Sequence, residues 1–372
     1  MKNACLLILL ISFFTACKKT SVASKKSTSL ITSKANLHFL DEYVLQDSLV
    51  FKNSIIGGLS GIDYANGLYH FVVDDQRNPR FLSANINIQN NKINTIDFKE
   101  VLFLSDSISH FYKENALDLE SIFMDEETEE FYFVSEGFIK GDKQPSVFTT
   151  NKEGVFKHQY KLPTHFSDLK NVKQNAVFEG STKSKDGKGF WVAMEGVLKA
   201  DGVEPTFKKT QSPVRITYFD KKTKNATKQF AYQLEHITKP AKGNINLNGV
   251  TAILEYKENH FFVIERTYQN GYGVYGNIVK IFEVSIDNET TNTLEINSLK
   301  EQNFILVKKR LAFNFEDVKN KLTDGIVDNL EGITLGPKLA NGNQSLILVS
   351  DDNFQKYGKQ LNQFILLEIT DK

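Results

Sequence analysis

The sequence predicts an all-β domain folded as a single β-propeller-like ring of five or six blades. Two observations lead to this fold class. Short runs rich in Val, Ile, Phe and Tyr alternate with turn-forming clusters of Asn, Gly, Asp and Lys, whereas long helical periodicity is scarce. In addition, one pattern of turn, strand and acidic residue recurs five times along the chain, which indicates a repeated structural unit.

The apolar runs have the length of buried β-strands. The clearest of them are 68–73, 131–134, 190–193, 260–264 and 345–349. Polar turn residues lie between these runs, as expected for antiparallel strands joined by short connections. We expect short helices only near 108–116 and 315–322.

Each repeat begins with a four-residue motif and ends with an acidic residue after an apolar strand. The motifs are Leu59-Ser60-Gly61-Ile62, Leu119-Glu120-Ser121-Ile122, Phe178-Glu179-Gly180-Ser181, Leu247-Asn248-Gly249-Val250 and Leu330-Glu331-Gly332-Ile333. The closing acids are Asp74 with Asp75, Glu136, Glu195, Glu265, and Asp351 with Asp352. The second residues of the motifs follow one another at intervals of 60, 59, 69 and 83 residues. A unit of this length holds about four strands, which favours a propeller blade over the shorter repeat of a solenoid.

The number of blades stays open at this point. The long last interval has room for a sixth, weaker unit around 278–313. The segment 37–45 and the final strand 364–369 are expected to pair and close the ring. Such closure removes the exposed strand edges that would otherwise aggregate.

The N-terminus has the features of an export signal. Met1-Lys2 is followed by a short apolar run over 6–14, too short to span a bilayer. Small residues stand directly before Cys17, as in bacterial lipoproteins. We therefore expect a signal peptide over 1–16, a lipidated Cys17 within a flexible tether over 17–36, and the propeller domain over 37–372. The alternative is an ordinary secretory signal that contains a cysteine by chance.

Composition narrows the location and the partners. Lys18 after Cys17 is not the acidic residue associated with inner-membrane retention, so we expect a lipid-anchored protein of the cell envelope, at the outer membrane. Cys5 and Cys17 are the two cysteines, so disulfides and thiolate metal sites are excluded from residues 37–372. The formal net charge of zero argues against nucleic acid as a partner. We expect a monomer.

Ring symmetry predicts where the acidic residues gather. Equivalent positions of the blades meet around one axis, and antiparallel neighbours put the motif and the closing acid at the same end. The predicted cluster contains Glu120, Glu136, Glu179, Glu195, Glu265, Glu331, Asp74, Asp75, Asp351 and Asp352. So many carboxylates need positive partners, either calcium or the nearby arginines Arg77, Arg80 and Arg266.

The hypothesis of a catalytic calcium site assigns a role to several of these residues. The expected catalytic residues are Glu120, Glu179, Glu265, Glu331 and Arg266, and the expected substrate-binding residues are Arg77, Arg80 and Arg266. The expected calcium ligands are Glu120, Glu136, Glu179, Glu195, Glu331 and Asp351. The alternative interpretation is structural: glycine turns and acidic strand ends are common without any ligand.

Other catalytic motifs are missing from the sequence. It contains no G-x-S-x-G elbow, P-loop, dinucleotide fingerprint, H-E-x-x-H motif or regular EF-hand loop. The seven histidines are scattered without metal-ligand spacing. Trp191, within an expected inner strand, is interpreted first as a core residue.

The repeats resemble a known family. The resemblance is carried by 118–122, 178–180, 263–266, 330–334 and 348–353, and it covers nearly all of 37–370. These segments are similar to the phytase-like family of exported bacterial proteins, described as "esterase-like activity of phytase". The resemblance implies a propeller-like fold and an ester or phosphoester hydrolase. By fold-level analogy with calcium-dependent propeller phytases, calcium would neutralise a phosphate group and arginine would bind its oxygens.

Two functional hypotheses follow. The first is a metal-assisted hydrolase of phosphate or carboxylic esters, acting on a small molecule at the cell envelope. The second is a non-catalytic propeller lipoprotein that binds a ligand or a protein.

The lipid anchor is testable at Cys17. Replacing Cys17→Ser removes the sulfur that would carry the lipid, so the variant should leave the membrane fraction and lose labelling by radioactive palmitate. Wild-type chain expressed in parallel is the control. A Cys17→Ser variant that still pellets with membranes and still takes up label would contradict the lipoprotein prediction.

Overall fold

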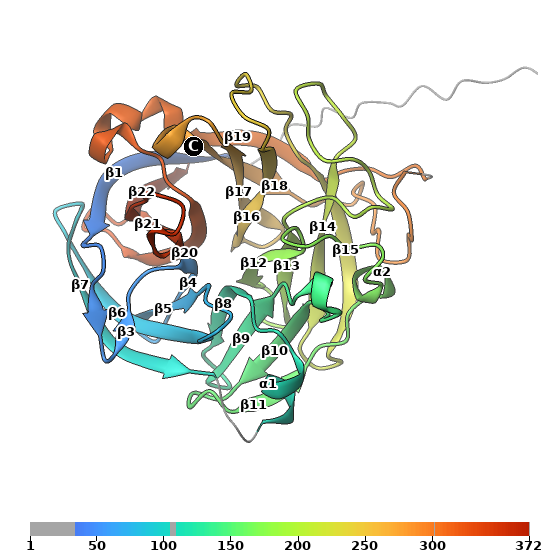
Figure 1. Ribbon diagram of the computed structural model, residues 1–372, viewed down its shortest axis with the longest axis horizontal. Coiled ribbons are helices and arrows are strands. Elements are labelled where there is room, and N and C mark those ends of the chain that lie inside the picture. The colour runs from blue at the N-terminus through green and yellow to red at the C-terminus, as the bar shows by residue number, and fades with distance from the viewer. Residues whose placement is uncertain (1–33, 105–108, 301, 372) are drawn as a thin grey trace, which may run out of the picture. The chain divides into compact units, whose positions relative to one another are not determined.

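The computed structural model describes residues 34–104, 109–300 and 302–371. In this part of the chain, five four-stranded antiparallel sheets stand around one axis as the blades of a propeller (Figure 1). This arrangement confirms the predicted all-β propeller and fixes the number of blades at five. Cys17 and the predicted signal peptide lie outside the described residues.

The strands of each blade are given from the axis outward. Blade 1 consists of β4 (Leu59–Ala65), β5 (Leu68–Val73), β6 (Arg80–Gln89) and β7 (Lys92–Phe103). Blade 2 consists of β8 (Leu119–Asp125), β9 (Glu130–Ser135), β10 (Ser146–Thr150) and β11 (Phe156–Gln159). Blade 3 consists of β12 (Phe178–Lys183), β13 (Gly189–Met194), β14 (Pro213–Asp220) and β15 (Asn225–Gln233). Blade 4 consists of β16 (Asn246–Lys257), β17 (His260–Gln269), β18 (Asn277–Ser285) and β19 (Lys308–Asn314). Blade 5 consists of β20 (Leu330–Lys338), β21 (Gln344–Ser350), β22 (Asn362–Asp371) and β1 (Ala35–Leu45).

The remaining elements are short. They are the hairpin of β2 (Val50–Phe51) and β3 (Ser54–Ile55), the helices α1 (His110–Glu114) and α2 (Thr164–Ser167), and the 3-10 turns η1 (Ile139–Gly141), η2 (Gly273–Tyr275), η3 (Phe315–Asp317), η4 (Lys319–Lys321), η5 (Thr323–Gly325) and η6 (Asn353–Gln355). The expected helix near 108–116 is α1, whereas the segment 315–322 forms 3-10 turns instead of an α-helix. Within the described residues, every helix is too short or too polar to cross a bilayer.

The ring closes in blade 5. Its outermost strand β1 comes from the N-terminal side, and its neighbour β22 comes from the C-terminal side (Figure 1). The antiparallel register pairs Leu37 with Ile369 and Leu45 with Asn362. The predicted closure by these two segments is therefore confirmed, and the last blade hides the edge of β22 behind β1.

The alternative of a sixth blade around 278–313 is wrong. This segment forms the two outer strands of blade 4, and the long connection between them packs against β15 of blade 3. The Thr293 N–H donates to the Gln229 carbonyl at 2.7 Å, and the Val307 N–H donates to the Ala231 carbonyl at 3.2 Å. The long last interval of the repeat thus comes from a connection that covers the edge of a neighbouring sheet.

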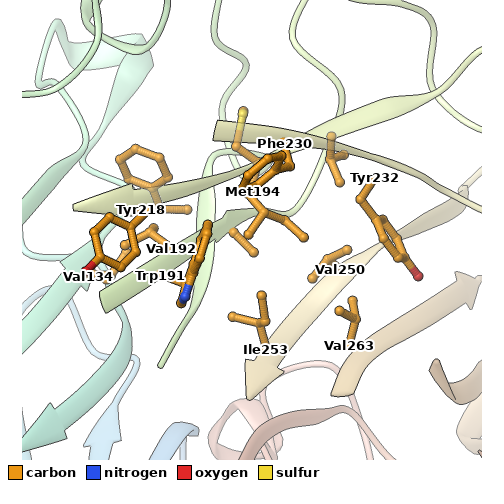
Figure 2. Packing of buried hydrophobic residues seen from close by; sticks show 14 of the residues in the cluster. Val134, Trp191, Val192, Met194, Tyr218, Phe230, Tyr232, Val250, Ile253 and Val263 are labelled. Carbon is orange, nitrogen blue, oxygen red and sulfur yellow. The ribbon is translucent and has the colours of Figure 1, made fainter. Parts of the chain in front are cut away.

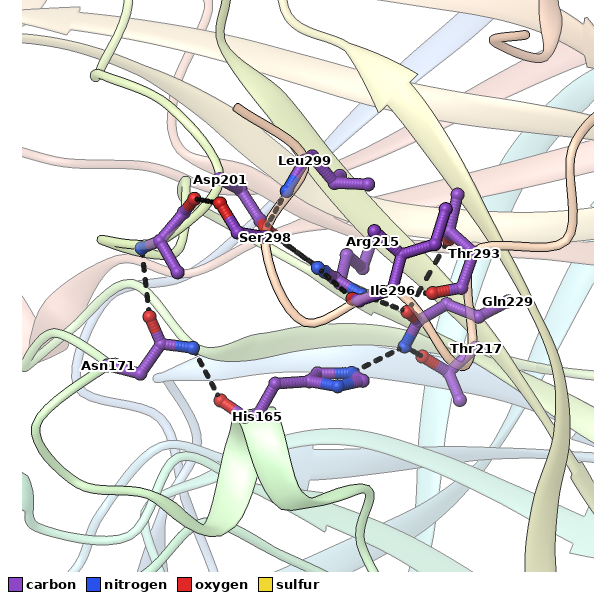
Figure 3. A network of polar contacts seen from close by, with 11 residues as sticks. His165, Asn171, Asp201, Arg215, Thr217, Gln229, Thr293, Ile296, Ser298 and Leu299 are labelled. Carbon is purple, nitrogen blue, oxygen red and sulfur yellow. Dashed lines mark hydrogen bonds and ion pairs between the residues drawn. The ribbon is translucent and has the colours of Figure 1, made fainter. Parts of the chain in front are cut away.

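A buried polar network fixes this connection. The Arg215 guanidinium donates to both Asp201 oxygens, at 2.6 and 2.7 Å, and to the Ile296 carbonyl at 2.9 Å (Figure 3). Both charged side chains are fully buried. Because each is paired and hydrogen-bonded, their burial is tolerated.

Apolar layers between adjacent sheets form the core. Trp191 packs edge-on against Tyr218, with ring centroids 4.9 Å apart (Figure 2). In the layer between blades 3 and 4 it also packs edge-on against Phe261, with ring centroids 5.2 Å apart. Trp191 is 2% exposed, so its interpretation as a core residue is confirmed. Aromatic contacts of this kind add stability beyond the buried area.

The motif glycines allow the inner strands to approach backbone to backbone. A Cβ atom at Gly61 would lie 3.0 Å from the Glu120 carbonyl oxygen of blade 2. A Cβ atom at Gly180 would lie 2.8 Å from the Ile253 nitrogen of blade 4. The glycines are therefore required by a close approach between blades.

Each inner strand also has a bulge, at its second residue in blades 1, 2, 3 and 5 and at its sixth residue in blade 4. The residue skipped by the pairing register is Ser60, Glu120, Glu179, Thr251 or Glu331 in the five blades. In blade 4 this residue is Thr251, three positions after the Asn248 that the sequence motif aligns with the other repeats. Hydrogen bonds to the next blade also make Thr251 equivalent to Ser60. The Ser60 hydroxyl donates to the Leu119 carbonyl at 2.9 Å, and the Thr251 hydroxyl donates to the corresponding Leu330 carbonyl at 2.8 Å. The sequence alignment of the fourth repeat is thus displaced by three residues.

An ion pair crosses the axial region at the other end of the inner strands. The Lys183 ammonium of blade 3 lies 3.0 Å from the Asp63 carboxylate of blade 1, and these blades are not neighbours in the ring. The same carboxylate accepts a hydrogen bond from the Met124 N–H of blade 2 at 2.9 Å. One buried carboxylate therefore connects three blades.

This ion pair should stabilise the ring. Lys183→Met leaves the buried Asp63 without its cation and should lower the free energy of unfolding by about 1–3 kcal/mol, less than for a fully buried pair because Lys183 is one-third exposed. Urea unfolding measures the change, with exposed Lys222→Met as the matched control. Adding Asp63→Asn to Lys183→Met should recover part of the loss. Equal unfolding midpoints for wild type and Lys183→Met would contradict the role of the ion pair.

Candidate functional site

Two positions in each blade meet at one end of the axis. The first is the bulged residue of the inner strand. The residue just before the bulge pairs with a residue of the second strand, and the second position is the residue directly after that partner. In blades 1, 2, 3 and 5 the second position makes the same backbone hydrogen bond: Asp74 to Gly58, Glu136 to Asp118, Glu195 to Val177 and Asp351 to Asn329, at 2.7–3.0 Å. In blade 4 this position is Arg266, since Glu265 pairs with Val250.

We call the resulting group of side chains the axial cluster. It consists of Asp74, Asp118, Glu120, Glu136, Glu179, Glu195, Glu331 and Asp351 together with Arg266. Each member interacts electrostatically with at least one other member. The structure thus brings together seven of the ten acidic residues grouped by ring symmetry, and adds Asp118.

Two groups of three carboxylates lie close enough to share a cation. The ligand oxygens of Asp74, Asp118 and Glu120 all lie within 4.8 Å of one another. Those of Glu136, Glu179 and Glu195 do the same. Glu136 is oriented by the Val177 N–H, which donates to its Oε1 at 2.5 Å.

Arg266 is the cation within the cluster. Its Nη1 lies 3.3 Å from Glu331 Oε1, and its Nη2 lies 3.5 Å from Glu195 Oε1. The buried Nε has no hydrogen-bond partner among the described residues. One guanidinium therefore faces eight carboxyl groups and cannot neutralise all of them.

Burial and mutual repulsion raise the pKa values of these carboxyl groups. Burial raises the pKa of Glu331 to about 8 and that of Glu195 to about 7, although Arg266 opposes both shifts. Burial and the charge of Asp74 raise the pKa of Asp118 to about 7. The pKa of Glu120 is raised well above its usual value by burial, then by the charges of Glu179 and Asp74. The cluster is therefore partly protonated at neutral pH unless a cation joins it.

The structure places Glu265 outside the axial cluster. Its carboxylate lies between blades 3 and 4, where it accepts hydrogen bonds from Tyr232 Oη at 2.5 Å, Asn248 Nδ2 at 2.8 Å and the Glu235 N–H at 3.0 Å. It also forms an ion pair with Lys309. Its contacts satisfy the charge locally.

The other predicted residues near the first and last blades lie at the border of the cluster, where Asp75 acts electrostatically on Asp74 and Asp352 on Asp351. Arg80 is buried and pairs with Asp75 at 2.8 Å. Arg77 is exposed. Asp352 accepts the Gly58 N–H at 2.8 Å and the Asn362 side-chain amide at 3.0 Å. These residues shape the loops around the cluster.

Sequence reasoning missed Asp118. It stands two residues before the bulged residue of blade 2, directly before Leu119. When the blades are aligned by their bulges, the residues at this position in the other blades are Gly58, Val177, Gly249 and Asn329. Because no acid recurs at this position, ring symmetry does not find it. A search for acids flanking the motifs would have been needed.

Comparison with protein-family models identifies the family of this chain. Residues 54–354 match the model of the phytase-like family, described as "esterase-like activity of phytase". An all-β five-bladed propeller with a carboxylate-rich axis is thus the class of protein that the structure defines. The chain belongs to the phytase-like family. Comparison with curated protein sequences found no match.

Solved structures resemble the chain distantly. A thermostable family-43 glycoside hydrolase has a TM-score of 0.47 and 8% identity, over 85% of this chain and 90% of that one. An exo-β-1,3-galactanase from Phanerochaete chrysosporium has a TM-score of 0.46 and 11% identity, over 89% and 64%. An endo-1,4-β-xylanase from Bacteroides thetaiotaomicron has a TM-score of 0.42 and 9% identity, over 83% and 90%.

The raised pKa values predict how stability depends on pH. In the presence of a chelator, the folded state holds protons on Glu331, Glu195 and Asp118 that the unfolded state releases, so stability should fall as pH rises from 6.5 through about 8. The slope should be about 1.4 kcal/mol per pH unit for each extra proton bound. Thermal melts at several pH values measure it.

The window begins at pH 6.5 for a physical reason. Burial lowers the pKa of His70 to about 4 and that of His165 to about 3, so both oppose the trend at lower pH. Glu331→Gln should flatten the dependence above pH 7. A stability that rises or stays constant between pH 6.5 and 8 without divalent cations would argue against the repulsion within the cluster.

Proposed function

We propose that this protein is a calcium-assisted hydrolase of phosphate or carboxylic esters, with its reacting centre at the axial cluster. Membership of the phytase-like family suggests a hydrolase. The observation that carries the proposal is the excess of buried carboxylates over cations at one end of the axis. Such an excess is costly unless it serves a ligand.

The donor set suits a hard cation. Calcium takes six to eight oxygen ligands at 2.3–2.6 Å and tolerates irregular geometry. Oxygens that share one such ion lie up to about 5 Å apart, and both groups of three fit this spacing. Asp74, Asp118 and Glu120 would hold one ion, and Glu136, Glu179 and Glu195 would hold a second.

The chain's own residues would orient the ester and handle a proton. When bound, calcium would supply positive charge for the ester oxygens. The Arg266 guanidinium would donate to an oxygen of the ester, since its Nε has no other partner among the described residues. Glu331 is suited to accept a proton from water at Oε2, because its Oε1 faces Arg266 and a nearby cation would lower its pKa from about 8.

The proposed location is the cell envelope, where the lipid on Cys17 would anchor the protein at the outer membrane. The substrate would then be a small ester or phosphoester reaching the protein from outside the cytoplasm.

Calcium should stabilise the fold through the axial cluster. A ligand that binds only the folded state adds about 2.7 kcal/mol at a hundredfold excess over its Kd. The melting temperature should therefore rise in excess calcium and fall again with chelator. Glu179→Gln should reduce this rise and abolish hydrolysis of 4-nitrophenyl phosphate or 4-nitrophenyl acetate.

Glu265→Gln is the matched control. Because Glu265 is held by Tyr232, Asn248 and Lys309, its loss of charge should lower the melting temperature equally with and without calcium. Wild-type melting temperatures that are identical in calcium and in chelator would contradict the metal hydrolase. Calcium stabilisation without hydrolysis of either ester would favour a ligand-binding propeller instead.

A further inference from the structure

A strained turn borders the axial cluster in blade 5. Three consecutive residues, Asn353, Phe354 and Gln355, have positive φ angles of 46°, 50° and 59°. None of them is glycine, and each costs of the order of 1 kcal/mol in this conformation. A conformation of this kind persists only where the surroundings enforce it.

Side chains on both sides of the turn enforce it. The Asp352 carboxylate accepts hydrogen bonds from the Phe354 N–H at 3.1 Å and from the Gln355 side chain at 3.3 Å. Asp351 Oδ1 accepts the Asn353 N–H at 2.7 Å. Asp351 belongs to the axial cluster, so the turn is connected directly to it.

The turn is seated on blade 1 by the Phe354 ring. A Cβ atom at Gly58 would lie 2.5 Å from Phe354 Cε2, so the ring rests on the bare glycine backbone. The Arg80 guanidinium lies 5.6 Å from the centre of the same ring. Phe354 thereby fixes the position of the residues that follow it.

The Gly58 carbonyl, next to which the Phe354 ring rests, accepts the Asp74 N–H at 2.7 Å, so the turn holds Lys356 at the Asp74 edge of the cluster. Its Nζ lies 5.4 Å from the centre of the Phe354 ring, and the side chain is exposed. Its positive charge acts on Asp74 and Asp118, two carboxyl groups of the cluster. Among the ion pairs of the described residues Lys356 does not occur, whereas Lys359, three positions later, pairs with Asp324 at 2.7 Å.

We propose that Lys356 is a substrate-positioning residue that binds the anionic group of the ester and makes the site selective for phosphomonoesters over neutral carboxylic esters. The inference rests on the proposed hydrolase and narrows its substrate class. The three carboxylates of Asp74, Asp118 and Glu120 carry one more negative charge than one calcium ion neutralises, so a dianionic group at this edge of the cluster still meets repulsion. The exposed Lys356 ammonium offsets this repulsion and so strengthens the binding of an anionic substrate. It does not change the binding of a neutral ester.

The test compares Lys356→Gln with Lys359→Gln in the full chain, in detergent and at fixed calcium. Calorimetry measures the Kd of inorganic phosphate, and steady-state kinetics measure 4-nitrophenyl phosphate against 4-nitrophenyl acetate. Lys356→Gln should raise the phosphate Kd and the KM for 4-nitrophenyl phosphate roughly tenfold, with unchanged kcat/KM for the acetate. Lys359→Gln should change neither.

The outcomes separate this inference from the proposed function. Equal phosphate affinity for wild type and Lys356→Gln overturns the role of Lys356. Hydrolysis of the acetate by a wild-type chain that does not bind phosphate also overturns it, while the hydrolase stands. Phosphate binding that depends on Lys356, in a chain that hydrolyses neither ester, supports the anion site and refutes the hydrolase. A parallel loss on both esters with a lowered melting temperature would make Lys356 merely structural.

Discussion

The close approach of adjacent inner strands, which requires glycine in blades 1, 3 and 5, is the constraint on which the rest of this structure depends. Where the backbones of adjacent blades nearly touch, as at Gly61 and Gly180, a side chain does not fit. The adjacent bulge residue is left out of the strand pairing. Three of the five bulge residues are glutamates, and the neighbouring positions supply further acids. Packing of the backbone thus concentrates carboxylates in a small volume around one axis.

That concentration is electrostatically unfavourable in the isolated chain. Burial and repulsion raise the pKa values of Glu331 and Glu195 against the opposing charge of Arg266. At the other end of the axis, the ion pair between Asp63 and Lys183 connects blades 1 and 3. The two ends are therefore built differently: one is neutralised by its own residues, and the other is left in need of positive charge.

The sequence predicts more of the fold than of the site. The strand runs, the repeat and the pairing of the terminal strands suffice for a propeller, because these depend on local patterns and on ring closure. The fourth repeat fails because Leu247-Asn248-Gly249-Val250 imitates the motif three residues before the actual bulge at Thr251. The closing acid of this repeat is also misplaced, by one residue: the sequence selects Glu265, whereas Arg266 occupies the equivalent position. Asp118 has no acidic counterpart in the other blades, so only the three-dimensional structure reveals it.

Burial alone does not distinguish the axial acids from the structural ones. Asp201 is fully buried, yet Arg215 binds both of its oxygens. Glu265 is also buried, yet it accepts hydrogen bonds from two side chains and a backbone amide and pairs with Lys309. The axial acids are buried or half-buried, but eight carboxyl groups share the Arg266 guanidinium and the exposed Lys356 at their edge. What separates the two kinds is compensation: a buried carboxylate whose own chain supplies its donors serves the fold, whereas a group of carboxylates without enough donors requires something from solution to complete it.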